Sequence, residues 1–376
     1  MKAPKVQKVV FDDKVAKEVF WRLILSFRAR EGIYAKNAID YAPQNSICPR
    51  ELLEPGNELK HAIWRLFAAS TDRRTQSMSQ YKAHAWLWTN HPHIYTKEVL
   101  KLTPKELQAI LRSPPKKADL GKKQVDAKCK LTQELFESDT LEDEGVDDEV
   151  VTGTLANLSG DTLSQNWLYL AKTLFEDLDG DPRNLFKQGV FRRSIDEVIK
   201  WREKVRKERG YNPLPGISGK ILSLIAVFLS EQGIIDVPEG TFPADLHAIA
   251  LCEAWGITRY QPETTGTHVA VKIRPKIYSV CKALGVSPVE LSHAVWILGQ
   301  SLCPKCYSKP ENAILCPMYE GCKGRLHHDR KRDKWCILVD GTPLRRRKAV
   351  SGPQAQFLVG SLVAQPILFK PKNHAE

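Results

Sequence analysis

Two groups of residues in this sequence could do chemistry: a glycine-containing turn followed by an aspartate, and four clustered cysteines. The turn, residues 214–220, reads Leu-Pro-Gly-Ile-Ser-Gly-Lys and precedes an apolar helix predicted over residues 221–229. Pro215 presets φ and the glycines allow a sharp reversal, which leaves backbone N–H groups unpaired where the helix starts. Such a helix start attracts anions, and a DNA phosphate is the natural anion for a basic protein.

Asp245 follows at the start of a further predicted helix, and its carboxylate is the candidate catalytic group. Cleavage of the N-glycosidic bond of a nucleotide passes through a transition state with positive charge on the sugar, which a nearby carboxylate stabilises. The same carboxylate could orient or deprotonate the attacking water. The alternative role of Asp245 is that of a helix cap. For His247, two residues later, we expect phosphate contact or core packing.

The cysteines Cys303, Cys306, Cys316 and Cys322 follow the spacing C-x2-C-x9-C-x5-C. Four thiolates this close together predict a metal site, and an odd total of nine cysteines without a signal peptide argues for a reducing compartment rather than a disulfide framework. Iron–sulfur ligation and a four-thiolate zinc site both suit these ligands, since C-x2-C is also a common zinc knuckle. We expect the metal to fix a loop whose Lys323 and Arg325 meet phosphates.

The order of the motifs resembles that of the helix-hairpin-helix DNA glycosylases, the superfamily of endonuclease III and the adenine glycosylases. The similarity runs over roughly residues 60–325 with one long interruption, and it rests on residues 66–72 ahead of Tyr81, on residues 214–217, on residues 245–247, and on residues 296–299 ahead of the cysteines.

This resemblance implies that Gly216, Ile217, Ser218 and Gly219 grip the DNA backbone and that Asp245 acts on a flipped nucleotide. It further implies that the cysteines hold a [4Fe–4S] cluster. The final C-x5-C spacing matches the family, whereas the first spacings depart from its usual C-x6-C-x2-C and keep zinc as the alternative.

Lys220 decides whether the resemblance also implies strand cleavage. Aligned without gaps, Lys220 falls where bifunctional members keep a Schiff-base lysine, and Ser218 falls where the family has its second glycine. If Gly219 is that glycine instead, Ile221 takes the place of the lysine and the enzyme is monofunctional. Both registers remain open.

The resemblance does not indicate which residue would fill the gap left by a flipped base. The glutamine that does so in endonuclease III aligns with Ala69. Arg73 and Arg74, in the break after the early helix, are the candidates for this role or for phosphate contact.

The formal charge of +12 favours a polyanionic partner, with double-stranded DNA first. The sequence has 376 residues, 42% of them hydrophobic, and no apolar run approaches the roughly 20 residues of a membrane span. These properties predict a monomeric cytoplasmic protein, associated with the nucleoid in a bacterium, and no membrane partner.

The predicted fold is mainly α, with two helical lobes, a helix-hairpin-helix motif, a four-cysteine metal loop and a small C-terminal β extension. Residues 1–57 would join the second lobe, 58–235 would form a barrel-like lobe that contains a flexible insertion at 113–160, 236–325 would form the second lobe with the metal loop, and 326–376 would form a basic extension. Thr103 and Asp12 or Asp13 are expected helix caps, and 58–69, 76–89 and 194–209 expected helices.

The predicted function is excision of a damaged or modified base from DNA, as in base-excision DNA repair, with AP lyase activity if Lys220 is the Schiff-base lysine. One alternative is a glycosylase for hypermodified bases, such as some viruses carry, or for RNA or nucleosides. Another is a metal-stabilised DNA-binding protein without catalysis.

Overall fold

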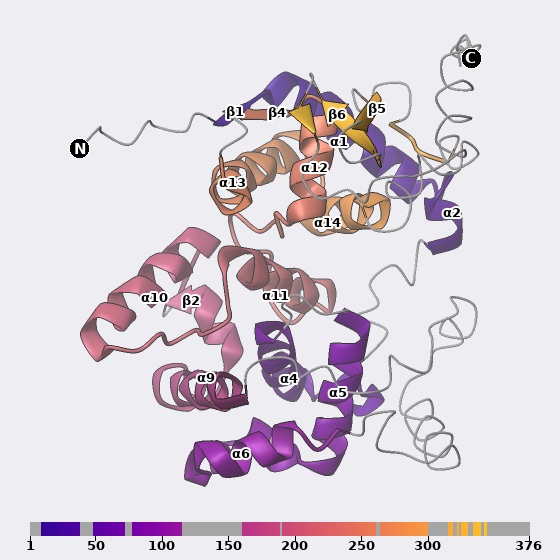
Figure 1. The fold of residues 1–376 in the computed structure, drawn as a ribbon. Coiled ribbons are helices and arrows are strands. Elements are labelled where there is room, and N and C mark those ends of the chain that lie inside the picture. Colours follow the sequence, from indigo (N-terminus) through magenta and orange to yellow (C-terminus); the bar gives the residue numbers. More distant parts are fainter. Residues whose placement is uncertain are drawn as a thin grey trace. The chain divides into compact units, whose positions relative to one another are not determined.

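The computed structural model is mainly helical, as predicted, and contacts divide the chain into two compact units (Figure 1). Unit 1 comprises Met1–Ala38 and Ala244–Glu376, and unit 2 comprises Ile39–Pro243. The structure describes residues 9–37, 48–71, 77–114, 160–188, 190–260, 264–299, 315–318, 322, 325–329, 334–339 and 342–343. Within these ranges, no helix combines the length and the apolar character needed to cross a membrane.

Unit 2 is built from helices joined by short 3-10 turns. In chain order its elements are η1 (Arg50–Leu52), α4 (Glu58–Ser70), α5 (Ser77–Asn90), η2 (Pro92–Tyr95), η3 (Lys97–Lys101), α6 (Pro104–Leu111), α9 (Gly160–Lys172), η7 (Thr173–Asp177), η8 (Pro182–Phe186), β2 (Lys187–Gln188), β3 (Phe191–Arg192), α10 (Ile195–Arg209) and α11 (Gly219–Glu231).

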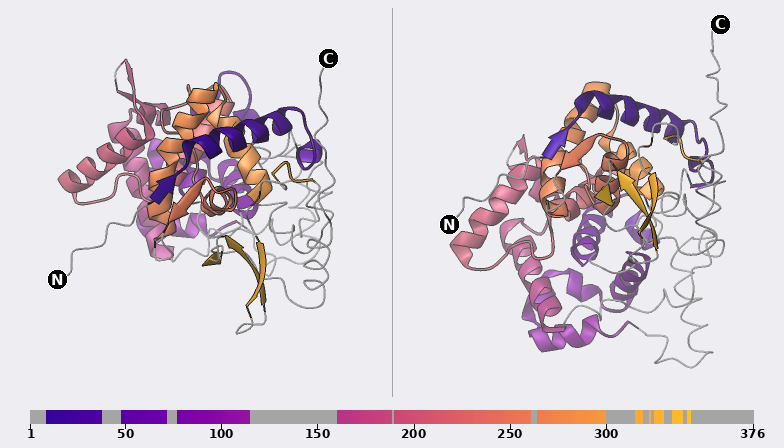
Figure 2. Two further views of the ribbon diagram at one scale, coloured as in Figure 1. Left: turned by 90° about the horizontal axis from the view of Figure 1, so that it is seen from above. Right: turned by 45° about the horizontal axis from the view of Figure 1, so that its top comes forward.

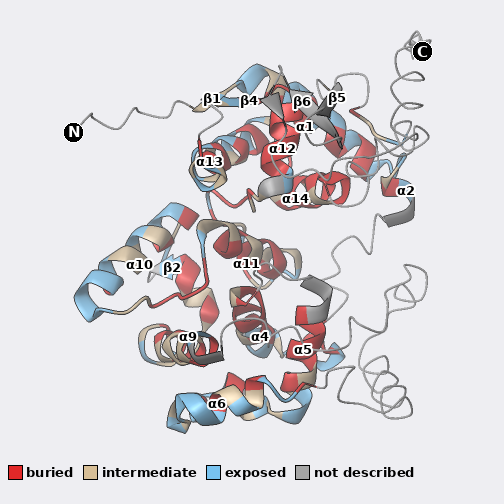
Figure 3. Ribbon diagram, viewed as in Figure 1, coloured by how far each residue is buried: buried red, intermediate tan, exposed pale blue. Residues whose placement is uncertain are grey.

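Several of these helices start where the local sequence predicts. Thr103 caps α6 and Ser194 caps α10, each in a capping box in which the side chain and the third helical residue, Glu106 or Glu197, satisfy each other's backbone N–H groups. Gly210 ends α10 in the left-handed conformation that favours glycine, with φ at +72°. The core of the unit lies where α4 packs on α11, and Figure 3 shows buried residues along both helices.

The helix that begins at Gly160 changes type near its end. The α-helix stops at Lys172, and η7 continues as a π-helix over Thr173–Asp177. The wider turn places the Asp177 carboxylate within 2.5 and 2.8 Å of the two terminal nitrogens of Arg209 on α10. Both residues belong to the same unit, so this contact ties the end of α9 to the last turn of α10.

Unit 1 joins the N-terminal segment to the second half of the chain. Its elements are β1 (Val9–Phe11), α1 (Asp13–Arg28), α2 (Tyr34–Asn37), α12 (Leu246–Ala254), β4 (Thr258–Tyr260), α13 (Gly266–Leu284), α14 (Pro288–Ile297), β5 (Arg325–Asp329), β6 (Lys334–Val339) and β7 (Thr342–Pro343). β1 pairs antiparallel with β4, and β5, β6 and β7 form an antiparallel sheet that includes the strand predicted in the C-terminal extension.

Helix α1 is the main link between the two parts of unit 1. Its N-cap is Asp12, whose carboxylate accepts hydrogen bonds from the backbone of Lys14 and Val15, and its apolar face contacts α13 and α14 (Figure 2). Arg28 adds a bidentate ion pair to Glu290 on α14, at 3.0 and 2.8 Å.

The unit boundaries lie at residues 38/39 and 243/244, where the sequence suggested 57/58 and 235/236. At the first boundary, η1 contacts α4, and the Cys48 sulfur lies 3.7 Å from Nε2 of His61 on α4. At the second, the N–H of Ile195 donates to the carbonyl of Glu239 at 2.9 Å, which holds the segment after α11 against the start of α10. These contacts connect residues far apart in sequence, which periodicity does not reveal.

Candidate functional site

The turn between α10 and α11 reverses the chain through a hydrogen-bonded bend. Ile217 N–H donates to the Leu214 carbonyl at 3.2 Å, with Pro215 and Gly216 between them. Gly216 has φ at +86°, a conformation that L side chains rarely adopt, so glycine is required here. Asn212 braces the entry, since its side-chain oxygen accepts from the N–H of Leu214 at 3.1 Å. The Leu-Pro-Gly sequence therefore forms the sharp bend that its residue types predict.

Ser218 begins α11 earlier than the sequence suggested. Its hydroxyl caps the helix by accepting from the N–H of Ile221 at 3.4 Å, and its carbonyl accepts from Leu222 at 2.8 Å. Gly219 and Lys220, expected in the turn, are consequently the first two residues of α11. The difference arises because the serine hydroxyl satisfies a helix donor that would otherwise stay unpaired.

The start of α11 carries free donors. In the part of the chain that the structure describes, no hydrogen bond satisfies the N–H groups of Ser218, Gly219 or Lys220. Because these groups and the helix dipole both favour negative charge, this end of α11 suits an oxyanion such as phosphate. Lys220 adds a cation in the same first turn, which is unfavourable by itself and becomes favourable once an anion is bound.

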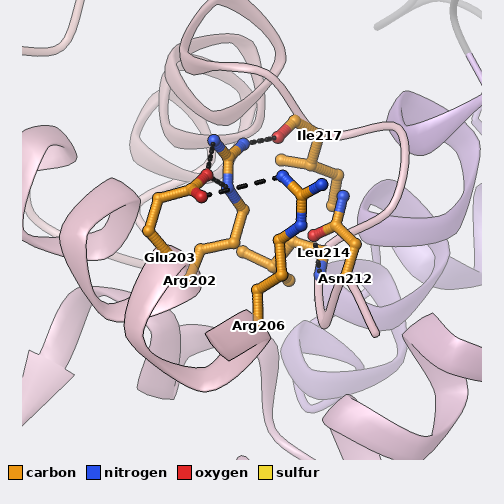
Figure 4. A network of polar contacts seen from close by, with 6 residues as sticks. All are labelled: Arg202, Glu203, Arg206, Asn212, Leu214 and Ile217. Atoms are coloured by element: carbon orange, nitrogen blue, oxygen red, sulfur yellow. Dashed lines mark hydrogen bonds and ion pairs between the residues drawn. The ribbon is translucent and has the colours of Figure 1, made fainter. Parts of the chain in front are cut away.

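A polar network on α10 supports this turn (Figure 4). Arg202 donates from Nη1 to the Ile217 carbonyl at 2.7 Å, and its Nε and Nη2 donate to Oε1 of Glu203 at 3.1 and 2.7 Å. Arg206 lies 3.8 Å from the other oxygen of Glu203 and keeps 61% of its side chain exposed. The sequence predicted α10 as a charged helix, but not that Arg202 contacts the turn.

The last turns of α10 carry more cations than carboxylates. Besides the network residues, the exposed cations of its last turns are Lys204, Lys207 and Arg209, and Figure 3 shows this helix as largely exposed or half-buried. Cations at the C-terminal end of a helix are stabilised by its dipole. Lys204 pairs with Glu208 and Arg209 with Asp177, and cations still outnumber carboxylates in these turns, so the end of α10 next to the turn keeps a net positive charge.

Asp245 is the N-cap of α12 in unit 1. One carboxylate oxygen, Oδ1, accepts from the N–H of Ala248 at 2.8 Å, and the residue is half-buried. Among the described residues, the second oxygen has no hydrogen-bond partner. The structural role that the sequence offered as the alternative is thus present, and one oxygen stays available for chemistry. The neighbouring His247 is exposed and lies against Gly299, where an added Cβ would come within 2.5 Å of the His247 Cβ.

The predicted metal loop is described in part. Cys316 and Cys322 are half-buried, whereas Cys303, Cys306 and Lys323 lie outside the described residues. The Leu315 carbonyl, next to Cys316, accepts from the N–H of Ile33 at 3.1 Å. Half-buried thiols on an anchored backbone fit metal ligation, and the full ligand set stays a prediction.

The anchor of this loop is the turn between α1 and α2. Gly32 has φ at +56°, and a Cβ there would lie 2.4 Å from the Leu315 carbonyl oxygen, so no side chain fits. Tyr34 beside it is fully buried and donates to the Ala294 carbonyl at 3.0 Å. Burial, followed by the charge of nearby Cys316, raises the pKa of Tyr34 well above its ordinary value.

The structure describes the other predicted contact residues only in part. Arg73 and Arg74 lie outside the described residues. Arg325 is the first residue of β5 and pairs with Leu338 on β6, with its side chain not described. Thr71, at the break that the sequence predicted, is buried and bonds to Nε2 of His84 at 2.8 Å, and the His84 ring stacks on Trp167 at 5.5 Å.

The structure shows an exposed apolar tip that the sequence analysis did not predict. Val190 and Phe191 are 93% and 74% exposed, the two largest exposures among the bulky apolar residues that the structure describes. They lie in the β2–β3 hairpin directly before α10, between exposed Lys187 and Arg192. The available signal was an apolar pair after Gly189 in a basic stretch, a pattern typical of a hairpin turn.

Comparisons with known proteins give no relative from which a function could be transferred. No protein-family model matches the chain, and neither do curated proteins or solved structures.

Proposed function

We propose that this protein is a DNA glycosylase with a helix-hairpin-helix motif formed by α10, the 210–218 turn and α11. The observation that carries the proposal is the start of α11, where the N–H groups of Ser218, Gly219 and Lys220 have no hydrogen-bond partner among the described residues, next to the cation-rich end of α10. A phosphate of duplex DNA would accept from these groups. The ordered resemblance of the motifs to the helix-hairpin-helix glycosylases supports the same reading.

Asp245 would supply the reaction chemistry. With Oδ1 held by the Ala248 N–H, the carboxylate has a fixed orientation and offers Oδ2 to the sugar of a flipped nucleotide. As the C1′–N bond lengthens, that oxygen stabilises the positive charge that develops on the sugar. The base leaves with the bonding electron pair and takes up a proton from solvent, while water adds to C1′ and gives its proton to the Asp245 carboxylate, so that an abasic site remains.

Lys220 would determine what happens to the abasic site. Its amine could form a Schiff base with C1′ and lead to strand cleavage, which defines a bifunctional enzyme. Lys220 is half-buried at the second position of α11, whereas Ile221, the residue of the other register, is buried. An amine with access to solvent can meet a substrate, so we favour Lys220 as the lyase candidate.

The cysteines Cys303, Cys306, Cys316 and Cys322 would hold a [4Fe–4S] cluster, with zinc as the alternative. The group would cross-link the loop and thereby shape the surface that carries Lys323 and Arg325. An absorption spectrum of the purified protein distinguishes the two metals. Iron–sulfur charge transfer gives a broad visible shoulder, and zinc gives none.

Val190 and Phe191 would enter the base stack beside the flipped nucleotide. Apolar side chains that proteins insert between base steps unstack them, and the flanking cations Lys187 and Arg192 suit the adjacent phosphates. Both side chains present apolar surface to solvent at one hairpin tip, as an inserted wedge requires. This role fills the position for which the sequence offered only Arg73 and Arg74.

The tip can be tested with 2-aminopurine in a duplex. We expect wild-type binding to raise its fluorescence by unstacking it, and the double variant Val190→Ser/Phe191→Ser to lose most of that rise. Val271→Ser, which alters an apolar residue 52% exposed on α13, is the matched control and should leave the signal unchanged. An unaltered rise in the double variant would contradict the role of the tip.

Base release is the decisive test of the proposed function. Purified protein is incubated with duplexes that carry a panel of lesions and hypermodified bases, and released bases are identified by mass spectrometry. We expect an abasic product from at least one duplex, its loss in Asp245→Asn, and a borohydride-trapped adduct that disappears in Lys220→Gln. Absence of any product, or full activity in Asp245→Asn, would overturn the proposal.

Two other functions differ in outcome. A glycosylase for RNA or free nucleosides would release a base from those substrates without a duplex. A DNA-binding protein without catalysis would bind duplexes tightly and release nothing. The basic hairpin favours a polymer over a free nucleoside, because several cations and donors lie along one surface.

A further inference from the structure

Arg202 links α10 to the turn through a contact that spans 15 residues of sequence. Its side chain is only 19% exposed, and each of its three guanidinium nitrogens already has an acceptor. Nη1 bonds to the Ile217 carbonyl, and Nε and Nη2 bond to Glu203. Three of its five N–H groups thus have protein acceptors and most of the side chain is buried, so its importance lies in what it holds rather than in a phosphate contact.

The peptide group between Ile217 and Ser218 transmits the effect of this hydrogen bond. The chain has no cis peptide among its described residues, and in a planar trans peptide the carbonyl and the following N–H point in opposite directions. Because Arg202 draws the Ile217 carbonyl toward α10, the N–H of Ser218 must point away from α10. This is the first of the unpaired donors at the start of α11.

We infer that Arg202 is a positioning residue, which aims the Ser218 N–H at the phosphate without itself contacting DNA. Glu203 acts as its counter-ion and keeps the guanidinium on the carbonyl rather than on a passing phosphate. The inference rests on the proposed function, since it assumes that the turn binds a phosphate. It adds a residue that the resemblance does not identify and a role distinct from charge attraction.

The salt dependence of DNA binding separates positioning from contact. Each phosphate contact contributes about −0.9 to the slope of log affinity against log salt concentration. We expect Arg202→Met to weaken binding to a short duplex about tenfold at every salt concentration, with the slope unchanged. Lys220→Met, which removes a direct contact, should reduce the slope by about 0.9.

Two further variants serve as controls. Arg112→Met removes the same charge from an exposed site at the end of α6 and should bind like wild type. Arg202→Lys keeps one donor for the Ile217 carbonyl and should recover most of the affinity. If Arg202→Met binds like Arg112→Met, or lowers the slope by about 0.9, the inference is overturned.

Amide hydrogen exchange tests the positioning without DNA. The Ile217 N–H, bonded to Leu214, should exchange at least about tenfold faster in Arg202→Met than in Arg112→Met if Arg202 holds the turn. Equal exchange rates would overturn the inference even where DNA binding is lost through misfolding. Conversely, if wild type fails to bind duplexes while exchange at Ile217 responds as expected, the proposed function fails and the bracing by Arg202 stands.

Discussion

At the scale of single residues, the proposed function gives Asp245 two tasks that ordinarily belong to different side chains. Oδ1 caps α12, and Oδ2, which has no hydrogen-bond partner among the described residues, would act on the substrate. A cap hydrogen bond to a carboxylate also fixes its rotamer, so the structural contact would orient the catalytic group. The two tasks can be separated by substitution, because asparagine caps helices about as well as aspartate does.

We therefore expect Asp245→Asn to abolish base release while leaving the free energy of unfolding nearly unchanged. Asp245→Ala should abolish release and also cost about 1 kcal/mol, because it removes the cap. Chemical denaturation of the three proteins measures the difference. Equal destabilisation by both substitutions would show that the cap does not depend on the side-chain oxygen.

Two buried histidines of unit 2 make its stability depend on pH. Burial lowers the pKa of His84 to about 3, and burial together with Arg65 lowers the pKa of His61 to about 3. Both rings stay neutral in the folded protein, whereas in the unfolded chain they take up a proton below about pH 6.5. Their contribution to the free energy of unfolding is therefore fully present above about pH 6.5, and it is lost as the pH falls from about 6.5 toward 3.

Each histidine should contribute about 1.4 kcal/mol of lost stability per pH unit in that range. The test is the free energy of unfolding of wild type and His84→Gln measured between about pH 7 and pH 5. The variant, which cannot titrate at this position, should show a shallower decline. Parallel curves would mean that His84 is not the group responsible.

At the scale of elements, the turn between α1 and α2 holds the backbone at Leu315, next to Cys316 of the predicted metal loop. Gly32 has no room for a Cβ because the Leu315 carbonyl oxygen would lie 2.4 Å away, and Ile33 bonds to the same carbonyl at 3.1 Å. The N-terminal segment thus supports a predicted metal loop that lies almost at the other end of the chain.

Gly32→Ala should disturb that loop more than a comparable glycine substitution elsewhere in unit 1. Gly285 is the matched control, because it has a similar φ of +65° against +56° and nothing within 4 Å of an added Cβ. Gly285→Ala should cost about 1 kcal/mol through backbone strain alone. We expect Gly32→Ala to lower the free energy of unfolding by more than this and to release metal to a chelator faster. Equal behaviour of the two variants would contradict the contact between Gly32 and the Leu315 carbonyl.

At the scale of the whole molecule, unit 1 is assembled from the two ends of the sequence. Helix α1 buries apolar side chains against α13 and α14, and β1 pairs with β4. Each large side chain buried in this way contributes about 1.5–3 kcal/mol, and α1 has several, so their sum rivals the total stability of a domain.

Deletion of residues 1–28 should consequently unfold unit 1 and leave unit 2 folded. Hydrogen exchange followed by mass spectrometry would show lost protection in α12, α13 and α14, with α4 and α11 still protected. Deletion of residues 1–8, which precede β1, is the control and should preserve both units. Retained protection of α13 after the longer deletion would show that α1 is dispensable.

The sequence by itself determined what depends on neighbours along the chain. The caps Asp12 and Thr103, the Pro-Gly bend and the mainly helical class follow from local hydrogen bonding and from apolar spacing, which act over a few residues. Even there, α11 starts two residues before the predicted residue 221, because the hydroxyl of Ser218 caps it. The candidate chemistry of Asp245 and of the cysteines was likewise readable from residue type and spacing.

Only the tertiary structure decided which distant residues support these groups. The contact of Arg202 with the Ile217 carbonyl, the seat that Gly32 forms for Leu315 and the pairing of β1 with β4 join positions that no periodic pattern relates. The exposure of Val190 and Phe191 belongs with them, because a side chain is exposed only when nothing else in the fold covers it. Such contacts arise from packing in three dimensions, where closeness in space is independent of closeness in sequence.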